Sequence, residues 1–308
     1  SFAHELLQPG MARQFWLRGR DIWVLDLRTS SGMPSRRRPW TFEQVAQADI
    51  PLAIDHIVRQ VARERGEEAD AIQVDVFAHC IGAVMISMAL LGNAPPSHHP
   101  NHAALKDLQA RIRRLALSQK GFVVEYRDAN VLRAYLLHQF KGLLSDGYHF
   151  RPSMFPGLGE RLYDAFLATL PYPPAEWEKE HPLWSATPWA ASRRRMDALY
   201  ERTFNIANIP DTVLHRIDDF FGSLNLETVS QTIHFARLGT ITDRTGRNVF
   251  ASPTRLAARW PTGGTLLISS AENGMVDPHS SLSMLDQLVR AGFCLLYTSP
   301  SPRDLSTS

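Results

Sequence analysis

The stretch from Val74 to Leu91 constrains the fold of this chain more than any other. It begins with an alternating run, residues 74–77, whose β-branched residues favour a strand. After Gly82 it continues as an almost unbroken apolar run of good helix formers. His79 and Cys80 lie between the two runs. The pattern predicts a strand, a sharp turn and a buried helix, with Cys80 at the apex of the turn.

A turn of this kind can present a reactive side chain, as in the nucleophile-elbow pattern Gly-x-Ser-x-Gly. Here Ala78 stands at the first glycine position, Cys80 at the serine position and Gly82 at the second glycine position. Small residues suit these positions because the strand and helix backbones pass close together. A helix N-terminus would also favour a Cys80 thiolate. The alternative is a structural cysteine in the strand–helix turn of any α/β protein, and the local sequence leaves both interpretations open.

Two other stretches have the near-continuous apolar character of strands in a parallel sheet. Residues 21–28 precede the Cys80 stretch and residues 264–270 follow it, while arginines make residues 111–118 an ambiguous further strand. Helical patterns separate these strands, which predicts right-handed crossovers and the fold class α/β with a parallel sheet. The expected helices span residues 48–63, preceded by a capping sequence at residues 41–44, and residues 280–291.

The pattern changes between about residue 122 and residue 255, where helical segments alternate with proline- and aromatic-rich joints. We predict a helical cap, residues 122–255, inserted between two parts of one core, residues 1–121 and 256–293. Aromatic side chains of this insertion either line an apolar pocket or form the insertion's own core; they are Trp184, Trp189, Tyr200, Phe204, Phe220 and Phe221.

Composition excludes several classes of function. The chain of 308 residues has 33 basic and 31 acidic residues and a net charge of +2, which gives no reason to expect a nucleic-acid partner. It lacks an apolar run of about 18 residues, so no membrane span is expected. Two cysteines allow at most one disulfide, and no signal peptide is visible, so we expect a cytoplasmic protein. His98, His99 and His102 lie in a Pro- and Asn-rich loop without a nearby carboxylate or Cys partner, and no Gly-x-Gly-x-x-Gly occurs, so neither a metal nor a cofactor is expected in this chain.

Three motifs together resemble those of α/β-hydrolases with a helical cap. "DIWVLDLR" at residues 21–28 resembles a core strand of acid-lipase-like hydrolases, and "AHCIGA" at residues 78–83 resembles their elbow. "LLISSAENGMVDP" at residues 266–278 resembles the strand and loop that carry the triad acid. The resemblance maps that acid to Asn273, and Asp277 is the alternative.

The Cys elbow, the Asn at the acid position and the phrases "FNIANIP" and "IDDFFGSLN" narrow the resemblance further. They are most similar to the hydrolase-like domain fused to bacterial glucose-methanol-choline (GMC), cholesterol-oxidase-like flavin oxidoreductases. Polyhydroxyalkanoate synthases, which also place a Cys at the elbow, are a second relative. The resemblance implies an apolar acyl or sterol-like substrate and an upstream flavin oxidoreductase domain as partner.

The resemblance also implies roles for particular residues. Cys80 would attack an acyl ester or thioester, and the Ile81 backbone N–H would bind the oxyanion. Asn273 or Asp277 would orient a triad histidine, and His79 would pack near the oxyanion site. The competing hypothesis is a non-catalytic hydrolase-like domain that binds an apolar ligand or docks on a sterol or alcohol oxidase of the GMC type.

The chain departs from the resemblance at both ends. In the family an oxyanion loop precedes the first strand and the triad histidine follows one more strand after the last helix. After Phe293 the sequence instead resembles translated sequencing-adapter read-through, so we expect residues 294–308 to lie outside the fold. His279 is the remaining downstream histidine and a weak candidate base. We expect a fragment truncated at both ends, with open sheet edges.

Overall fold

The computed structural model describes the core of the chain and parts of its middle. The described residues are 3–4, 6, 10–28, 30, 33–93, 98, 102–128, 130, 149–150, 155–169, 194–198, 212–213, 216, 220, 226–270 and 273–294.

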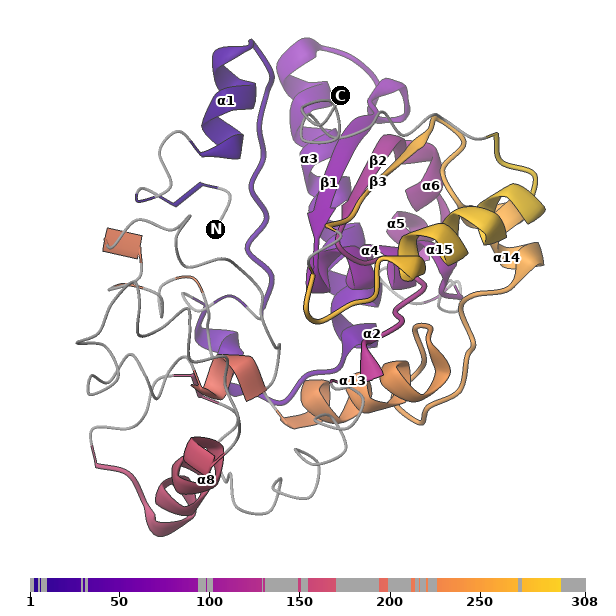
Figure 1. Ribbon diagram of the computed structural model, residues 1–308. Helices are drawn as coiled ribbons and strands as arrows, with labels where there is room; N and C mark the ends of the chain where they lie inside the picture. The colour runs from indigo at the N-terminus through magenta and orange to yellow at the C-terminus, as the bar shows by residue number, and fades with distance from the viewer. Residues whose placement is uncertain are drawn as a thin grey trace, which may run out of the picture.

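A three-stranded parallel sheet forms the centre of the described structure (Figure 1). Its strands are β1 (Val74–His79), β2 (Ile112–Ser118) and β3 (Thr265–Ile268), in the spatial order β1-β2-β3. In the register of the sheet, Ala78 pairs with Leu117 and Leu117 pairs with Leu267. The predictions of a strand before Cys80, a strand at residues 111–118 and a strand at residues 264–270 are confirmed, and the fold is of the α/β kind.

Helices pack against this sheet, and most of the predicted ones are present. Thr41 and Gln44 form the reciprocal hydrogen bonds of a capping box, as their spacing predicts, and Gly66 ends the long helix in a left-handed conformation with φ of 68°. A π-helical turn, η2 (Val45–Asp49), joins the cap to that helix. The α-helices are α1 (Met11–Leu17), α2 (Phe42–Gln44), α3 (Ile50–Arg65), α4 (Ile81–Leu91), α5 (His102–Lys106), α6 (Leu108–Arg111), α8 (Leu158–Thr169), α13 (Leu226–Leu238), α14 (Pro253–Arg259) and α15 (His279–Arg290).

The prediction of a buried strand at residues 21–28 is wrong. The segment is extended and runs beside β1 in Figure 1, but it forms no strand, and Val24 is 52% exposed. The segment contacts η2 and α3. The Arg28 guanidinium binds the Asp49 carboxylate, and the Trp23 ring lies edge-on to the His56 ring with 6.4 Å between the ring centres. An apolar run shows what a segment can bury, but a strand also needs a hydrogen-bonding neighbour about 4.8 Å away. No described strand provides one.

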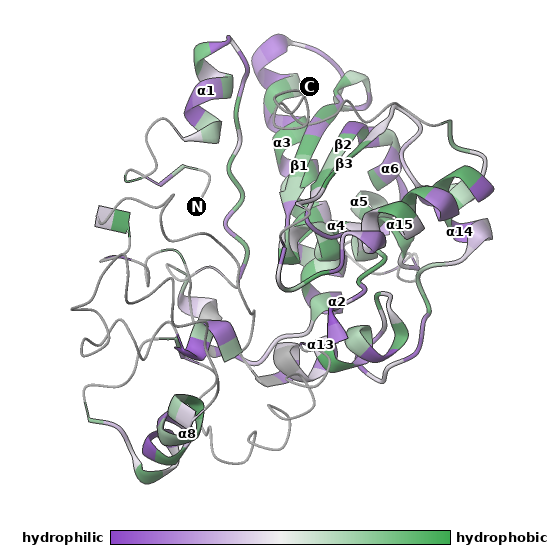
Figure 2. Ribbon diagram, in the orientation of Figure 1, coloured by the Kyte–Doolittle hydropathy of each residue, from purple (hydrophilic) through white to green (hydrophobic). Residues whose placement is uncertain are grey.

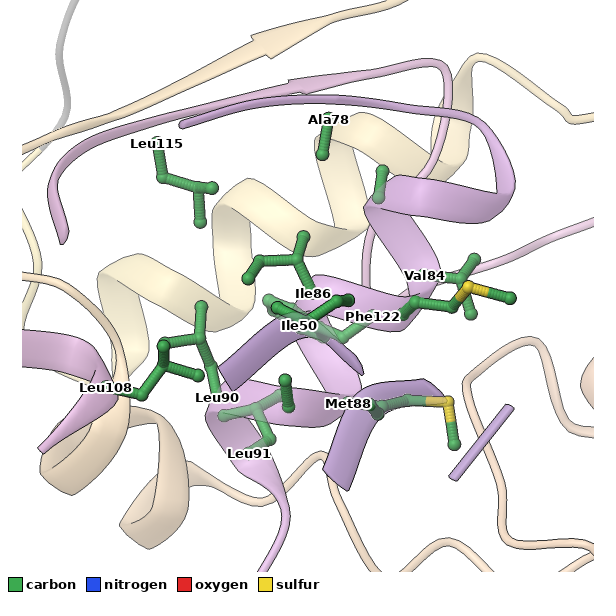
Figure 3. Close-up of a cluster of buried hydrophobic side chains, with 14 of the residues drawn as sticks. Ile50, Ala78, Val84, Ile86, Met88, Leu90, Leu91, Leu108, Leu115 and Phe122 are labelled. Carbon is green, nitrogen blue, oxygen red and sulfur yellow. The ribbon is translucent and has the colours of Figure 1, made fainter. Parts of the chain in front are cut away.

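The helices that pack on the sheet share one of its faces. All crossovers in a β1-β2-β3 order advance in the same direction, so right-handed connections place their helices on the same side. Figure 3 shows Ala78 and Leu115 pointing from the strands toward Ile86 on α4. Helix α4 is apolar along its length in Figure 2, and nine of its eleven residues are buried, because it lies between the sheet and the other helices.

The opposite face of the sheet is open at β3. Side chains alternate across a strand, so Phe77, Ala116 and Leu266, which are paired in the register, share this second face. Leu266 is 52% exposed, and Ile268 is 38% exposed. This open surface is a face of the sheet, and the expectation of open sheet edges stays a prediction.

The middle of the chain is described only in part. Helices α8 and α13 lie within residues 122–255, while Trp184, Trp189, Tyr200, Phe204 and Phe221 lie outside the described residues, as do residues 295–308. Both ends of this segment join the main core, through buried residues that pack with the sheet and α4: Phe122, Val123, Val124, Phe235, Ile241 and Phe250. Among the described residues, no helix is long and apolar enough to cross a membrane.

Candidate active site at the carboxyl edge of the sheet

Cys80 occupies the apex of the predicted strand–turn–helix. Its backbone has φ of 51° and ψ of −118°, a conformation that is strained for any residue with a Cβ. The Cys80 N–H donates to the Ser118 carbonyl at 2.9 Å, which fixes the turn to the end of the neighbouring strand β2. The sequence prediction for this turn is confirmed, and the backbone strain marks Cys80 as a candidate functional residue.

The N-terminus of α4 adjoins Cys80. Ile81 is the first residue of the helix, and the N–H groups of a first turn have no intrahelical acceptor. An amide in this position is available to an oxyanion beside Cys80. The reason given for a small residue at position 82 is wrong, because a Cβ built on Gly82 meets no atom within 4 Å. The unusual backbone conformation of the turn is that of Cys80 itself.

Gln119 turns the chain at the end of β2. It is the only other described non-glycine residue with positive φ, at 71°, and its N–H donates to the Ile268 carbonyl at 2.7 Å. Its side-chain Oε1 accepts a 2.6 Å hydrogen bond from Asn273 Nδ2. Gln119 therefore joins the ends of β2 and β3 and brings the loop after β3 to the edge where Cys80 lies.

Asn273 is held within its own loop. Its Oδ1 accepts hydrogen bonds from the N–H groups of Met275, at 2.9 Å, and Val276, at 3.1 Å. Together with the bond to Gln119, these contacts use both ends of the side-chain amide. Placement at the carboxyl edge of β3 agrees with the prediction, but the described contacts of Asn273 are structural ones, with no histidine among them.

Lys120 is a buried cation beside this edge, and the sequence analysis missed it. Its side chain is 8% exposed, and its Nζ lies 3.4 Å from Met275 Sδ and 5.3 Å from the centre of the Tyr126 ring. Burial by itself lowers the pKa of the Lys120 ammonium, but the neighbouring Cys80 and Tyr126 groups offset it, and the net direction is upward.

Tyr126 completes the surroundings of the buried cation. Burial raises the pKa of its phenol, and a Cys80 anion nearby raises it as well, although Lys120 opposes both effects. The phenol is thus neutral at pH 7. We call Cys80, Gln119, Lys120, Tyr126, Asn273 and Met275 the Cys80 cluster. The signal that points to it is a lysine two residues after a predicted strand and just before the apolar stretch at residues 122–124.

His79 lies at the end of β1, with its Nδ1 3.0 Å from Ser118 Oγ. Desolvation, and then the positive charge of Lys120, lower the pKa of the imidazole, although one side of the residue remains exposed. The ring is therefore neutral at pH 7. Side chains alternate along β1, so His79 lies on the face opposite to that of Ala78.

The lowered pKa of His79 predicts a pH dependence of stability. As the pH falls from about 7 to about 5, the unfolded chain takes up a proton at this position before the folded chain does, so the free energy of unfolding decreases. His79→Gln removes the titration and keeps a polar side chain, and we expect it to lose less stability over this interval. Urea unfolding of both proteins at several pH values measures the difference; equal losses would contradict the assignment.

Asp277 and His279 belong to the start of α15 and to a contact with Glu125. Asp277 Oδ1 accepts from the His279 N–H at 2.8 Å, which is ordinary helix-start chemistry. The His279 ring is mostly exposed and lies 2.9 Å from Glu125 Oε2, and this hydrogen bond raises the pKa of the imidazole. Ser283 Oγ lies 3.1 Å from the same ring nitrogen. The described contacts of His279 thus pair it with Glu125.

Two further observations bear on the choice of site. A shallow groove between α14 and α15 is lined by Glu125, Leu256 and Ser283 among others, and no member of the Cys80 cluster lines it. Within the part of the chain that the structure describes, no group of three or more His, Cys, Asp or Glu residues is placed to hold a metal ion.

Comparison with known proteins gave no match: no family model, no curated protein and no solved structure matches this chain.

Proposed function

We propose that this chain is the core of an α/β-hydrolase that cleaves or transfers acyl groups with Cys80 as nucleophile. The observation that carries the proposal is the strained backbone of Cys80 at the junction of β1 and α4. Strain of this kind costs about 1–3 kcal/mol and persists where the surrounding structure enforces it, often at active sites. It supports a functional role for Cys80 over a space-filling one.

The proposed reaction has two steps. The Cys80 thiolate attacks the carbonyl carbon of an ester or thioester, the carbonyl oxygen becomes an oxyanion beside the Ile81 N–H, and the bond to the leaving group breaks. The leaving alkoxide or thiolate takes a proton from solvent. Water, or an acceptor alcohol in a transferase, then attacks the new thioester, loses its proton to solvent and releases Cys80 as a thiolate.

The proposed substrate is an ester or thioester of an apolar acyl or sterol-like compound. This choice comes from the sequence resemblance to hydrolase-like domains of GMC-type oxidoreductases, with a flavin domain as the proposed partner. A site at this edge agrees with the backbone hydrogen bonds that link the ends of the three strands. Cys80 N–H donates to the Ser118 carbonyl, and Gln119 N–H donates to the Ile268 carbonyl. Ligands of parallel sheets bind beyond such carboxyl ends.

Covalent trapping tests the proposal. The protein is incubated with a series of p-nitrophenyl esters and acyl thioesters of increasing chain length, and the intact mass and the modified peptide are determined. We expect one acyl group on Cys80 and none in Cys80→Ala. The second described cysteine, Cys294, is exposed, so Cys294→Ser serves as the matched control and should retain the adduct. Acylation of Cys294 alone would reject the proposed nucleophile.

A non-catalytic hydrolase-like domain remains the second candidate function. It is favoured by Asn273, whose amide is already used by Gln119 and by the loop backbone. This candidate predicts that folded protein forms no adduct on Cys80 with any ester or thioester, while it still binds an apolar fluorescent ligand. An adduct on Cys80 would contradict it.

A further inference from the structure

The buried position of Lys120 requires an explanation. Transfer of an ammonium group from water into a protein interior is costly unless a charge or hydrogen-bond acceptor compensates it. The described contacts of Lys120 Nζ are the Met275 thioether sulfur, the Tyr126 ring and a hydrogen bond with the neutral Tyr126 phenol, and no carboxylate is among them. A thioether is a weak acceptor and an aromatic face offsets only part of the cost. The ammonium therefore lacks a strong anionic partner in the described structure unless Cys80 provides it.

The backbone brings the positions of Cys80 and Lys120 to neighbouring strand ends at the carboxyl edge of the sheet. Cys80 and Lys120 follow adjacent parallel strands, and the Cys80 N–H donates to Ser118, two residues before Lys120. The positive φ of Gln119 redirects the chain between them, so that the lysine enters the interior instead of continuing along the strand. The loop after β3 then closes over the lysine with Met275.

We propose that the Lys120 ammonium is the charge partner of a Cys80 thiolate and stabilises that thiolate as the imidazolium does in a Cys–His pair. The catalytic role of this ion pair rests on the proposed function, but the ion pair itself can be tested without measuring turnover. On formation of the pair, the Cys80 S–H bond breaks, its proton goes to solvent, and Lys120 keeps its own proton. Lys120 is thus a positioning residue that acts through Cys80.

The other titratable groups around the pair do not supply this charge. Tyr126 faces both Cys80 and Lys120 and is a neutral phenol at pH 7. His79 faces Lys120 and is a neutral imidazole at the same pH. The ammonium is therefore the charge that acts on the thiol among these neighbours. In this arrangement Asn273 needs no histidine to orient, and its role is to hold the loop that covers Lys120.

The test is the pH dependence of alkylation of Cys80 by iodoacetamide, followed peptide by peptide so that Cys294 is counted separately. In the full chain we expect a midpoint clearly below about 8.5, the ordinary value for a thiol. Lys120→Met should raise the midpoint and slow alkylation near pH 7 about tenfold or more, and Lys120→Arg should restore most of the rate. The matched control is Lys106→Met, which removes an exposed lysine on α5 and should leave the profile unchanged.

Either of two results would overturn the proposal. One is an unchanged profile in Lys120→Met that retains its circular dichroism and cooperative unfolding. The other is a midpoint of about 8.5 in the unsubstituted protein, which decides the matter even if the methionine variant does not fold. The two hypotheses fail separately: a low midpoint without acyl adducts removes the proposed function alone, and adducts on a thiol of ordinary midpoint remove the ion pair alone.

Discussion

Replacing Cys80 with alanine or with glycine is expected to abolish acyl-adduct formation and to lower ester turnover by at least about a thousandfold. Removal of a nucleophile in enzymes of this chemistry costs several orders of magnitude, and the residual rate comes from binding and oxyanion stabilisation. The two variants should be indistinguishable in activity, because neither carries a group that can form the covalent intermediate.

The same two variants should differ in stability in an unusual direction. Glycine normally destabilises a folded protein relative to alanine by about 0.5–1 kcal/mol, because the unfolded glycine chain has more freedom. At φ of 51° and ψ of −118°, an alanine Cβ keeps the strain whereas glycine removes it. We therefore expect the glycine variant to be the more stable of the two, by about 1 kcal/mol.

Urea unfolding together with a chromogenic ester assay measures both effects. Alanine more stable than glycine would show that the turn is relaxed in solution and that the strain argument for Cys80 fails. Turnover retained in either variant would show that the nucleophile is another residue. The pair of variants thus separates the geometry of the turn from its chemistry.

Gly263→Ala is expected to cost about 3 kcal/mol of stability, or to prevent folding. Gly263 lies two residues before β3, and a Cβ built there lies 1.8 Å from the Arg113 carbonyl oxygen on β2. The obstructing atom belongs to the backbone, so relief requires the start of β3 to move away from β2. The adjacent hydrogen bond from Leu115 N–H to the Gly264 carbonyl would lengthen as a result. Overpacking of this kind typically costs about 1–3 kcal/mol, and backbone obstruction lies at the upper end.

Gly82→Ala is the matched control for this change. It adds the same methyl group, but at a helix position with no atom within 4 Å. Alanine has the higher helix propensity, so we expect no loss and a gain of up to about 0.5 kcal/mol. Thermal or urea unfolding of both variants gives the comparison; equal effects would mean that the contact between Gly263 and Arg113 is not formed in solution.

The elements that the sequence predicted well are those whose signals are local. The alternation before Cys80, the apolar run after it and the Thr41–Gln44 cap depend on neighbours within a few residues, and the structure has each of them. Cys80 was found for the same reason, because its place between two periodic runs is visible in one stretch of sequence.

The failures concern partners that are distant in the chain. Residues 21–28 have the composition of a strand, but pairing depends on a neighbour that composition does not reveal. Lys120 was missed because its burial arises from Met275, about 155 residues further along, and from the turn at Gln119. Asn273 was located correctly, yet its hydrogen bonds to Gln119 and to its own loop follow from three-dimensional contacts alone.

The open face of the sheet affects how this protein behaves at different concentrations. Leu266 and Ile268 present apolar surface to water, and β1 has a described strand partner on one side only. Two molecules that associate through such surfaces bury apolar area that a single molecule exposes to water. An unpaired strand edge can also pair with a strand of another molecule. Folding is a first-order process whereas such association is second-order, so the yield of folded monomer on refolding should rise with dilution.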